Sequence, residues 1–357
     1  MKKLASLVLA GAMAFSLAAC GNNSTPAGGS SANAGTSTPA ASTPASGGIE
    51  PIELTIYSPG NENSVPTKTI IEYARLVNEA SDGAITLDVH HSNELGSDAE
   101  SIESTRMGTI DLIFAGTSGF TSFYEKAKVL DLPFLFDSAE QAYEVTNSEI
   151  GEQIFSGLEE FGLVFLSEGD NGMRHISTTN RPVHTAADVQ GLKIRVQDMK
   201  SQTDMMNYLG GIPVAMSYGD VYTSLQTGII DGTENNETAL TTGKHGEVCK
   251  VYSVDQHAMI PDVLIMSEKV WKQISPEDQQ IILEAAHNST EAHKVMWDTA
   301  IEEAVKEAQE TMGVEFVYDV DKEAFREATQ PMIEAYENEY PGVKTLMDTI
   351  EAAREGE

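Results

Sequence analysis

The sequence predicts a two-lobed α/β protein that follows an N-terminal export segment. Strand-like and helix-like segments alternate along the chain, which is typical of α/β folds with a largely parallel sheet. Removing the first 48 of the 357 residues leaves 309, a length more typical of two lobes than of one core. A short pattern at residues 106–111 also returns at 226–231, as expected for two lobes of similar design.

The first twenty residues have the order of a bacterial secretory signal. Lys2 and Lys3 precede an apolar run over residues 4–15, and Leu17-Ala18-Ala19-Cys20 follows. The apolar run is too short for a transmembrane helix, which needs about 20 residues. A cysteine directly after Leu-Ala-Ala resembles the bacterial lipobox. We therefore predict a lipoprotein signal peptide over residues 1–20 with a lipid on Cys20; the alternative is an ordinary signal peptide with an unrelated cysteine.

Residues 21–48 are predicted to be a disordered tether. The segment 22–48 carries no charge and consists mainly of Ser, Thr, Ala, Gly and Pro, with little to bury. As a flexible coil it would span roughly 30 Å. These features predict an extracytoplasmic protein, lipid-anchored to the outer face of the cell membrane or periplasmic.

The charge of the chain excludes one large class of partners. The formal net charge is −33, and it becomes −35 once Lys2 and Lys3 leave with the signal. Nucleic-acid binding needs clustered lysines and arginines, so we expect none. The one other cysteine, Cys249, is predicted to be a small core residue and not a nucleophile.

The first lobe begins as a regular alternation of strands and helices. Serine, aspartate and glycine residues end the first helix, and Gly108 ends the second, because glycine tolerates the left-handed conformation after a helix. The expected elements are strand 53–57, helix 67–80, strand 85–89, helix 98–107 and strand 110–115.

Later elements begin at recognisable caps. A capping box at residues 185–188 precedes a short helix and a strand over 192–196, and residues 217–220 cap another helix. Ser275 caps a long helix with Pro276 at its first position. The apolar pattern of that helix continues to Gly313, so its length of roughly 54 Å would span both lobes.

Three of the seven arginines fall within residues 174–195, in an otherwise acidic chain. Arginine matches a carboxylate through two parallel hydrogen bonds, so this basic spot suits a small organic acid. Arg195 lies on a predicted strand, facing away from the apolar side; its alternative is a surface arginine. Arg174 lies beside a turn; its alternative is a salt bridge to Asp170.

Other polar residues flank these arginines without forming a catalytic constellation. Tyr218 is expected at a helix entrance, where it could wall a pocket, and Asn235 follows a strand in a polar cluster. His90 and His91 point to opposite faces of a strand, and His287 and His293 are too far apart for a metal pair on a helix. We therefore predict no metal and no cofactor.

Four stretches of the sequence resemble the extracytoplasmic solute receptors of TRAP transporters, of the DctP type. The similarity runs over roughly residues 49–350 in the right order. The stretches are Asn93-Glu94-Leu95-Gly96-Ser97-Asp98, the run 129–136 (VLDLPFLF), Gly191-Leu192-Lys193-Ile194-Arg195 and the run 221–235 (VYTSLQTGIIDGTEN).

The resemblance implies a periplasmic-binding-protein-like fold of two α/β lobes, joined by crossing strands and a long helix that spans both. Lobe 1 would comprise residues 49–171 plus about 261–300, and lobe 2 residues 172–260 plus about 301–357. It implies a receptor, not an enzyme, that captures a C4-dicarboxylate or a sugar acid such as a uronate by lobe closure and delivers it to membrane permease subunits.

The resemblance also assigns roles to single residues. Arg195 matches the arginine that pairs with the substrate carboxylate, and Arg174 matches a second arginine. The remaining predicted ligand-binding residues are Asn235, Tyr218, Asp98 and Thr117.

The sequence departs from the family pattern in places that bear on the substrate. Gly116 and Gly119 replace larger polar residues of sialic-acid receptors, and Asn235 speaks against the metal-assisted oxo-acid subtype. Glu94 and Ala99 also differ from the usual residues. Two alternatives stay open, an exported enzyme acting on an acidic sugar and a sensory receptor.

Overall fold

The computed structural model describes residues 51–355. The chain divides into two units, Met1–Ser46 and Gly47–Glu357, and the described residues belong to the second. The predicted signal peptide, the lipid on Cys20 and the tether over 21–48 lie outside the described residues.

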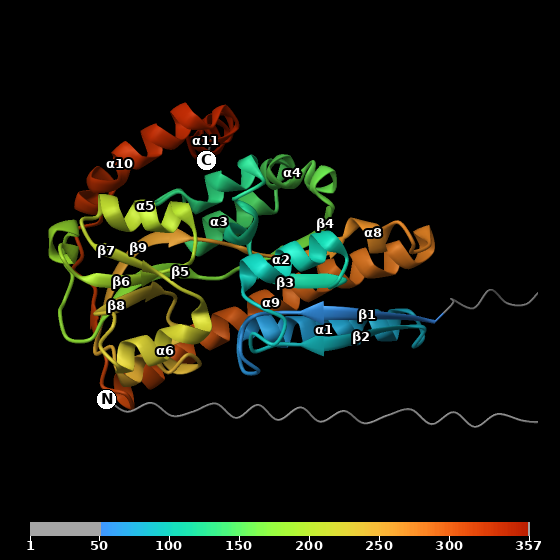
Figure 1. Ribbon diagram of the computed structural model, residues 1–357, viewed down its shortest axis with the longest axis horizontal. Helices are drawn as coiled ribbons and strands as arrows, with labels where there is room; N and C mark the ends of the chain where they lie inside the picture. The colour runs from blue at the N-terminus through green and yellow to red at the C-terminus, as the bar shows by residue number, and fades with distance from the viewer. Residues whose placement is uncertain (1–50, 356–357) are drawn as a thin grey trace, which may run out of the picture. The chain divides into compact units, whose positions relative to one another are not determined.

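The first sheet has five strands in the order β2-β1-β3-β10-β4 (Figure 1). Strand β1 pairs in parallel with β2 and β3, while β10 runs antiparallel to β3 and β4. Its strands are β1 (Ile52–Tyr57), β2 (Ile85–His90), β3 (Leu112–Gly116), β4 (Leu163–Gly169) and β10 (Asp262–Ser267). The predicted alternation is therefore present, although β3 begins two residues later than expected.

The second sheet has six strands in the order β11-β9-β5-β8-β6-β7. Strand β6 pairs in parallel with β7 and β8, while β5 runs antiparallel to β8 and β9. Its strands are β5 (Met173–Thr178), β6 (Lys193–Val196), β7 (Ile212–Ala215), β8 (Gly232–Asn235), β9 (Val251–Met259) and β11 (Glu315–Val317).

Helices connect and cover the strands of both sheets. The α-helices are α1 (Val65–Ala80), α2 (Asp98–Met107), α3 (Ala139–Thr146), α4 (Glu149–Phe155), α5 (Lys200–Tyr208), α6 (Tyr218–Gln226), α7 (Thr238–Thr241), α8 (Glu268–Trp271), α9 (Pro276–Glu310), α10 (Lys322–Glu339) and α11 (Pro341–Glu355). The 3₁₀ helices are η1 (Thr117–Phe120), η2 (Glu125–Asp131), η3 (Leu158–Phe161), η4 (Ala186–Val189) and η5 (His245–Glu247).

The two sheets share a repeated unit, which explains the repeated sequence pattern. The order β1-α1-β2-α2-β3 in the first sheet matches β6-α5-β7-α6-β8 in the second. Gly108 and Gly228 both adopt positive φ angles, of 75° and 70°, after the second helix of each unit. Asp111 then accepts the Thr55 N–H at 2.7 Å, and Asp231 accepts the Lys193 N–H at 2.9 Å. Each carboxylate thus ties its strand to the neighbouring parallel strand.

Two crossings of the chain connect the sheets. Strand β4 leads into β5 through residues 170–172, and β9 leads into β10 through residues 260–261. Helix α9 also runs alongside both parts of the fold, because it contacts α1 and β4 of the first part and α7, which follows β8 of the second sheet (Figure 1). It has 35 residues and begins as predicted, with Ser275 Oγ accepting the Asp278 N–H at 3.1 Å and proline in its first turn. It ends at Glu310, slightly before the predicted Gly313.

The largest apolar cluster runs from the first sheet into the second and under the C-terminal helices. It contains buried residues such as Ile113, Ile194 and Phe325. Helix α10 contacts α5 and β9, whereas α11 contacts η2 and α4. Because the last two helices touch segments predicted for different lobes, the proposed lobe boundaries at 171, 260 and 300 stay a prediction.

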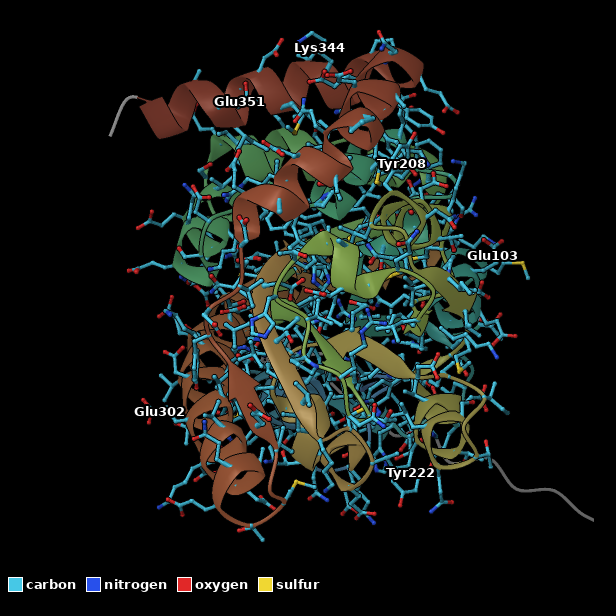
Figure 2. The ribbon with its side chains drawn as sticks, turned by 90° about the vertical axis from the view of Figure 1, so that its left-hand side faces the viewer. Glu103, Tyr208, Tyr222, Glu302, Lys344 and Glu351 are labelled. Carbon is cyan, nitrogen blue, oxygen red and sulfur yellow. The ribbon has the colours of Figure 1, made fainter. Side chains whose placement is uncertain are left out.

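Many charged side chains lie on the outside of the protein. Glu103 and Glu302 are exposed and point away from the body (Figure 2). Among residues 51–355, no helix combines the length and apolar character needed to cross a bilayer.

Candidate functional site

Both sheets contribute residues to one cavity of about 120 Å³. A buried water needs roughly 10–15 Å³ of such space, so the cavity has room for a small organic molecule. The lining residues are Ser58, Pro59, Gly60, Ser64, Pro66, Asp98, Phe114, Ala115, Gly116, Asn171, Arg174, Arg195, Gln197, Tyr218, Asn235, Asn236, Thr238, Ala239, Thr242, Asp262 and Trp297. Five of the six predicted ligand-binding residues are among them.

Arg195 lies in β6, between β7 and β8, with 3% of its surface exposed. The alternative of an exposed surface arginine is therefore wrong. Its Nε and Nη2 donate hydrogen bonds to the Met216 carbonyl at 3.1 and 2.9 Å. Burial lowers the pKa of Arg195 to about 10, so the guanidinium stays charged at neutral pH. Within the described part of the chain, no carboxylate forms an ion pair with it.

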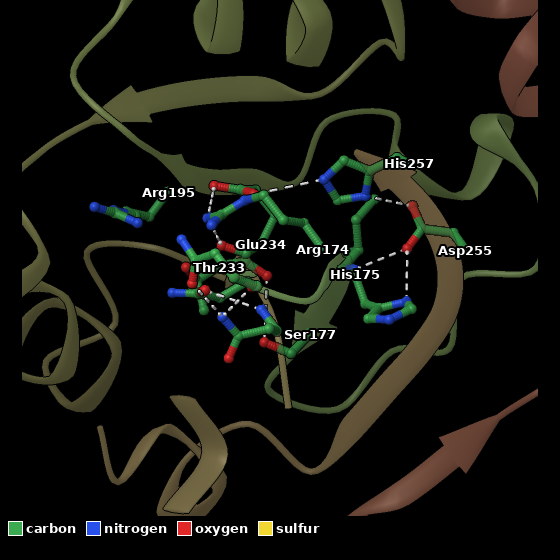
Figure 3. Close-up of polar contacts among 12 residues, drawn as sticks. Arg174, His175, Ser177, Arg195, Thr233, Glu234, Asp255 and His257 are labelled. Carbon is green, nitrogen blue, oxygen red and sulfur yellow. Dashed lines mark hydrogen bonds and ion pairs between the residues drawn. The ribbon is translucent and has the colours of Figure 1, made fainter. Parts of the chain in front are cut away.

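Arg174 in β5 is paired with a carboxylate of the adjacent strand β8. Its Nε contacts Glu234 Oε2 at 2.6 Å and its Nη2 contacts Oε1 at 2.9 Å, so the two side chains form a two-pronged ion pair (Figure 3). Burial opposes both charges, yet each partner offsets that cost: the pKa of Arg174 is raised and that of Glu234 is lowered to about 2. Asp170, the alternative partner, instead accepts the Gly172 N–H at 2.7 Å.

A buried polar network continues behind this ion pair (Figure 3). His257 Nε2 lies 3.5 Å from Glu234 Oε2, and its Nδ1 lies 2.8 Å from Asp255 Oδ2. Burial lowers the pKa of His257, but Asp255 and Glu234 more than offset this and raise it to about 9. The negative charge of Glu234 is therefore balanced by Arg174 on one side and by the charged His257 on the other. In Figure 3 the Arg195 side chain points away from this network.

Three further predicted residues line the cavity from the ends of elements. Tyr218 and Asp98 are the first residues of α6 and α2, and they occupy the same place in the two repeated units. Burial raises the pKa of both groups. Asn235 ends β8, and its Oδ1 accepts the Asn236 N–H at 2.9 Å. The repeated unit thus places an acid and a phenol at corresponding helix entrances.

Thr117 is not part of the cavity lining. It follows the lining residue Gly116, is fully buried, and its hydroxyl has no hydrogen-bond partner among the described residues. A ligand contact for Thr117 stays a prediction.

Sequence reasoning missed several lining residues, because no local pattern distinguishes them. Asp262 and Asn171 lie at the two crossings, and Asn171 Nδ2 donates to Asp262 Oδ1 at 3.1 Å. Trp297 comes from the middle of α9 and Ser58 follows β1. Their Nε1 and Oγ atoms are buried and have no hydrogen-bond partner in the part of the chain that the structure describes. Only the crossing of the chain and the spanning helix bring these four residues together.

Other candidate chemistries find no support in the described residues. No group of three or more His, Cys, Asp or Glu side chains among them could hold a metal ion. Cys249 is buried, as predicted, and burial raises the pKa of its thiol to about 12. Such a thiol is protonated at neutral pH and is a poor nucleophile.

Comparison with known sequences places this chain among bacterial solute-binding proteins. A family model described as bacterial extracellular solute-binding protein, family 7, matches residues 59–339. The uncharacterized protein YiiZ of Salmonella typhimurium is 35% identical, over 82% of this chain and 90% of that protein. The C4-dicarboxylate-binding periplasmic protein DctP of Rhodobacter capsulatus is 32% identical, over 61% of this chain and 66% of that protein.

Comparison with solved structures agrees. A TRAP periplasmic solute-binding protein from Anaerococcus prevotii, with bound D-glucuronate, has a TM-score of 0.82 at 32% identity, covering 85% of this chain and 99% of that one. A second, from Sulfitobacter, with bound β-D-galacturonate, has a TM-score of 0.80 at 32% identity, covering 83% and 98%. These likenesses confirm the predicted two-lobed α/β fold.

Proposed function

The chain belongs to family 7 of the bacterial extracellular solute-binding proteins and is a solute receptor of the TRAP type, and from this premise we propose that it captures a small organic acid between its lobes. A uronate is the ligand that we favour, because similar structures hold glucuronate and galacturonate. A C4-dicarboxylate is the second candidate, because DctP of Rhodobacter capsulatus binds one.

The Arg195 guanidinium is the observation that supports this proposal. It is a buried cation, held in place by an uncharged carbonyl, at the wall of a cavity of small-molecule size. A buried charge is costly unless an opposite charge meets it. A ligand carboxylate would supply that charge, with Arg174 and Asn235 completing the contacts.

We propose that capture proceeds by closure of the two lobes. The cavity has walls from both sheets, so a ligand inside it would bridge them. A ligand shifts such an equilibrium only by its different affinity for the two states, and contacts made to both walls exist only when the lobes are closed. The closed receptor would then deliver the acid to membrane permease subunits.

Residues 1–48 would hold this receptor at a membrane surface. The proposal is that cleavage before Cys20 and lipidation of its thiol leave the receptor on a tether over residues 21–48. Its support is the order of charge, apolar run and Leu-Ala-Ala-Cys. Cys20→Ala should move the protein from the membrane fraction to the soluble fraction; a protein that stays soluble with Cys20 intact would overturn the anchor.

Calorimetric titration of the purified receptor tests the function. We expect saturable binding of D-glucuronate or D-galacturonate at one site, and weaker binding after Arg195→Ala. Failure to bind any uronate or C4-dicarboxylate would overturn the proposal. The family consists of receptors, and we propose that this chain has no catalytic role; recovery of chemically unchanged ligand by mass spectrometry checks that point, and conversion of the ligand would contradict it.

A further inference from the structure

Two acidic side chains line the same cavity as the arginines. Asp98 begins α2 and is half-buried, while Asp262 begins β10 and is 5% exposed. Among residues 51–355, neither carboxyl forms an ion pair with a lysine or arginine, although Arg195 and Arg174 act on them at longer range. The cavity therefore carries cations on β5 and β6 and carboxyls on the elements of the first sheet.

Both carboxyls converge on Gly116, the last residue of β3. Asp262 is the ladder partner of Gly116, and a side chain at Gly116 would place its Cβ 3.6 Å from Asp262 Oδ1. The backbone N–H of Gly116 acts on the Asp98 carboxyl. Burial raises the pKa of both carboxyls, and the nearby Asp98 carboxyl raises that of Asp262 further.

Two carboxyls that line one wall of a cavity have a defined preference for ligand groups. Their oxygens accept hydrogen bonds, so they suit ligand hydroxyl groups, which can donate them. A second ligand carboxylate at this place would meet like charge in a poorly solvated space.

Two further lining atoms point to a polar ligand. Trp297 Nε1 and Ser58 Oγ are buried and have no hydrogen-bond partner within the described residues. Buried donors of this kind are usually satisfied, so each calls for a ligand or water oxygen. The Trp297 and Phe114 rings also give the cavity an apolar wall that would fit the C–H face of a sugar ring.

We propose that Asp98 and Asp262 form a carboxyl pair that makes the cavity selective for polyhydroxy monocarboxylic acids and rejects ligands with a second carboxylate. This inference rests on the proposed function of the same cavity. It assigns the ligand carboxylate to Arg195 and the hydroxyl groups to the opposite wall, and so decides between the sugar acid and the C4-dicarboxylate.

Matched ligands provide the test. D-glucuronate and D-galacturonate each have a diacid counterpart, D-glucarate and galactarate, in which a second carboxylate replaces the C1 aldehyde and the chain stays open. By calorimetric titration we expect the wild-type protein to bind the tighter uronate at least 100-fold more strongly than its diacid or succinate. Asp98→Asn and Asp262→Asn should each weaken uronate binding at least tenfold and reduce the uronate-to-diacid preference at least tenfold.

Asp131→Asn is the matched control, because Asp131 is a buried carboxyl that does not line the cavity. It should keep the wild-type preference. If Asp262→Asn does not fold, Asp98→Asn alone tests the inference, because Asp98 is only half-buried. Equal binding of uronate and diacid by the wild type, or an unchanged preference in the folded variants, would overturn the inference alone. Failure of the wild type to bind any of these acids would overturn the proposed function instead.

Discussion

The Arg195 guanidinium is fixed by the Met216 carbonyl, which accepts hydrogen bonds from its Nε and Nη2 at 3.1 and 2.9 Å. The carbonyl thereby orients one edge of the guanidinium but does not neutralise its positive charge. Arg174 lies in β5, which is separated from β6 by β8, and its charge is instead neutralised by Glu234 of β8. Arg195 is therefore available to pair with a ligand carboxylate, whereas Arg174 contributes to the stability of the fold through its ion pair.

Arg195→Ala should reduce the affinity for the organic acid by about ten- to 150-fold, since hydrogen bonds to charged groups contribute about 1.5–3 kcal/mol. The unliganded variant should be no less stable than the wild type, because a buried charge without an ionic partner is removed. Calorimetric titration and chemical denaturation measure the two effects. Arg181→Ala is the control, since Arg181 is exposed and does not line the cavity. Wild-type affinity in Arg195→Ala would contradict the assignment.

Glu234→Gln should lower the free energy of unfolding of the unliganded protein by about 3–5 kcal/mol, because it leaves the Arg174 charge buried without its carboxylate partner. Urea denaturation measures the change. Glu72→Gln removes one partner of the exposed pair with Arg75 and should cost less than about 1 kcal/mol. Similar losses in the two variants would show that burial of the ion pair is not what matters.

The contribution of Glu168 to stability should be lost as pH rises from about 4.5 to 8. Burial raises the pKa of this carboxyl to about 8, so the folded state binds a proton that the unfolded state releases. The contribution of Glu168 to stability is fully present below its pKa in the unfolded state. It is lost as pH rises through its pKa in the folded state. At 1.36 kcal/mol per pKa unit, Glu168 should contribute on the order of 4 kcal/mol less to the free energy of unfolding at pH 8 than at pH 4.5.

Glu168→Gln should remove this part of the pH dependence and make the protein more stable than the wild type at pH 8. Urea denaturation at a series of pH values measures it. A wild-type pH profile in the variant would mean that Glu168 does not titrate in this range.

Asn61→Ala should speed ligand release about two- to twelvefold. Asn61 Nδ2 donates to the Thr242 carbonyl at 3.1 Å and so joins the β1–α1 loop to the end of α7, and a hydrogen bond contributes about 0.5–1.5 kcal/mol. Because Trp297 lines the cavity, its fluorescence can report release in a stopped-flow experiment. The exposed neighbour Asn63 gives the control Asn63→Ala, and equal release rates in the two variants would exclude Asn61 as a contact that retains the ligand.

Local sequence determined most of the secondary structure, including the strand that holds the candidate site residue Arg195. Caps at Ser275 and Thr185 and the glycine stop at Gly108 mark helix ends where the structure has them, because these signals act over a few residues of backbone. The same holds for Arg195, since side chains alternate along a strand and the strand could be recognised. The repeated pattern around Asp111 and Asp231 likewise reflects a local hydrogen bond to the adjacent strand.

Only the tertiary structure determined the partner of Arg174 and the residues that line the cavity opposite the arginines. Arg174 could not be assigned to Glu234 over Asp170, because its partner is 60 residues away on a neighbouring strand. Asp262, Asn171 and Trp297 reach the cavity only because two crossings and a spanning helix bring distant segments together. The position of Asp262 beside Gly116 likewise depends on the antiparallel register of β3 and β10, and register between distant strands is set by packing and not by either strand alone.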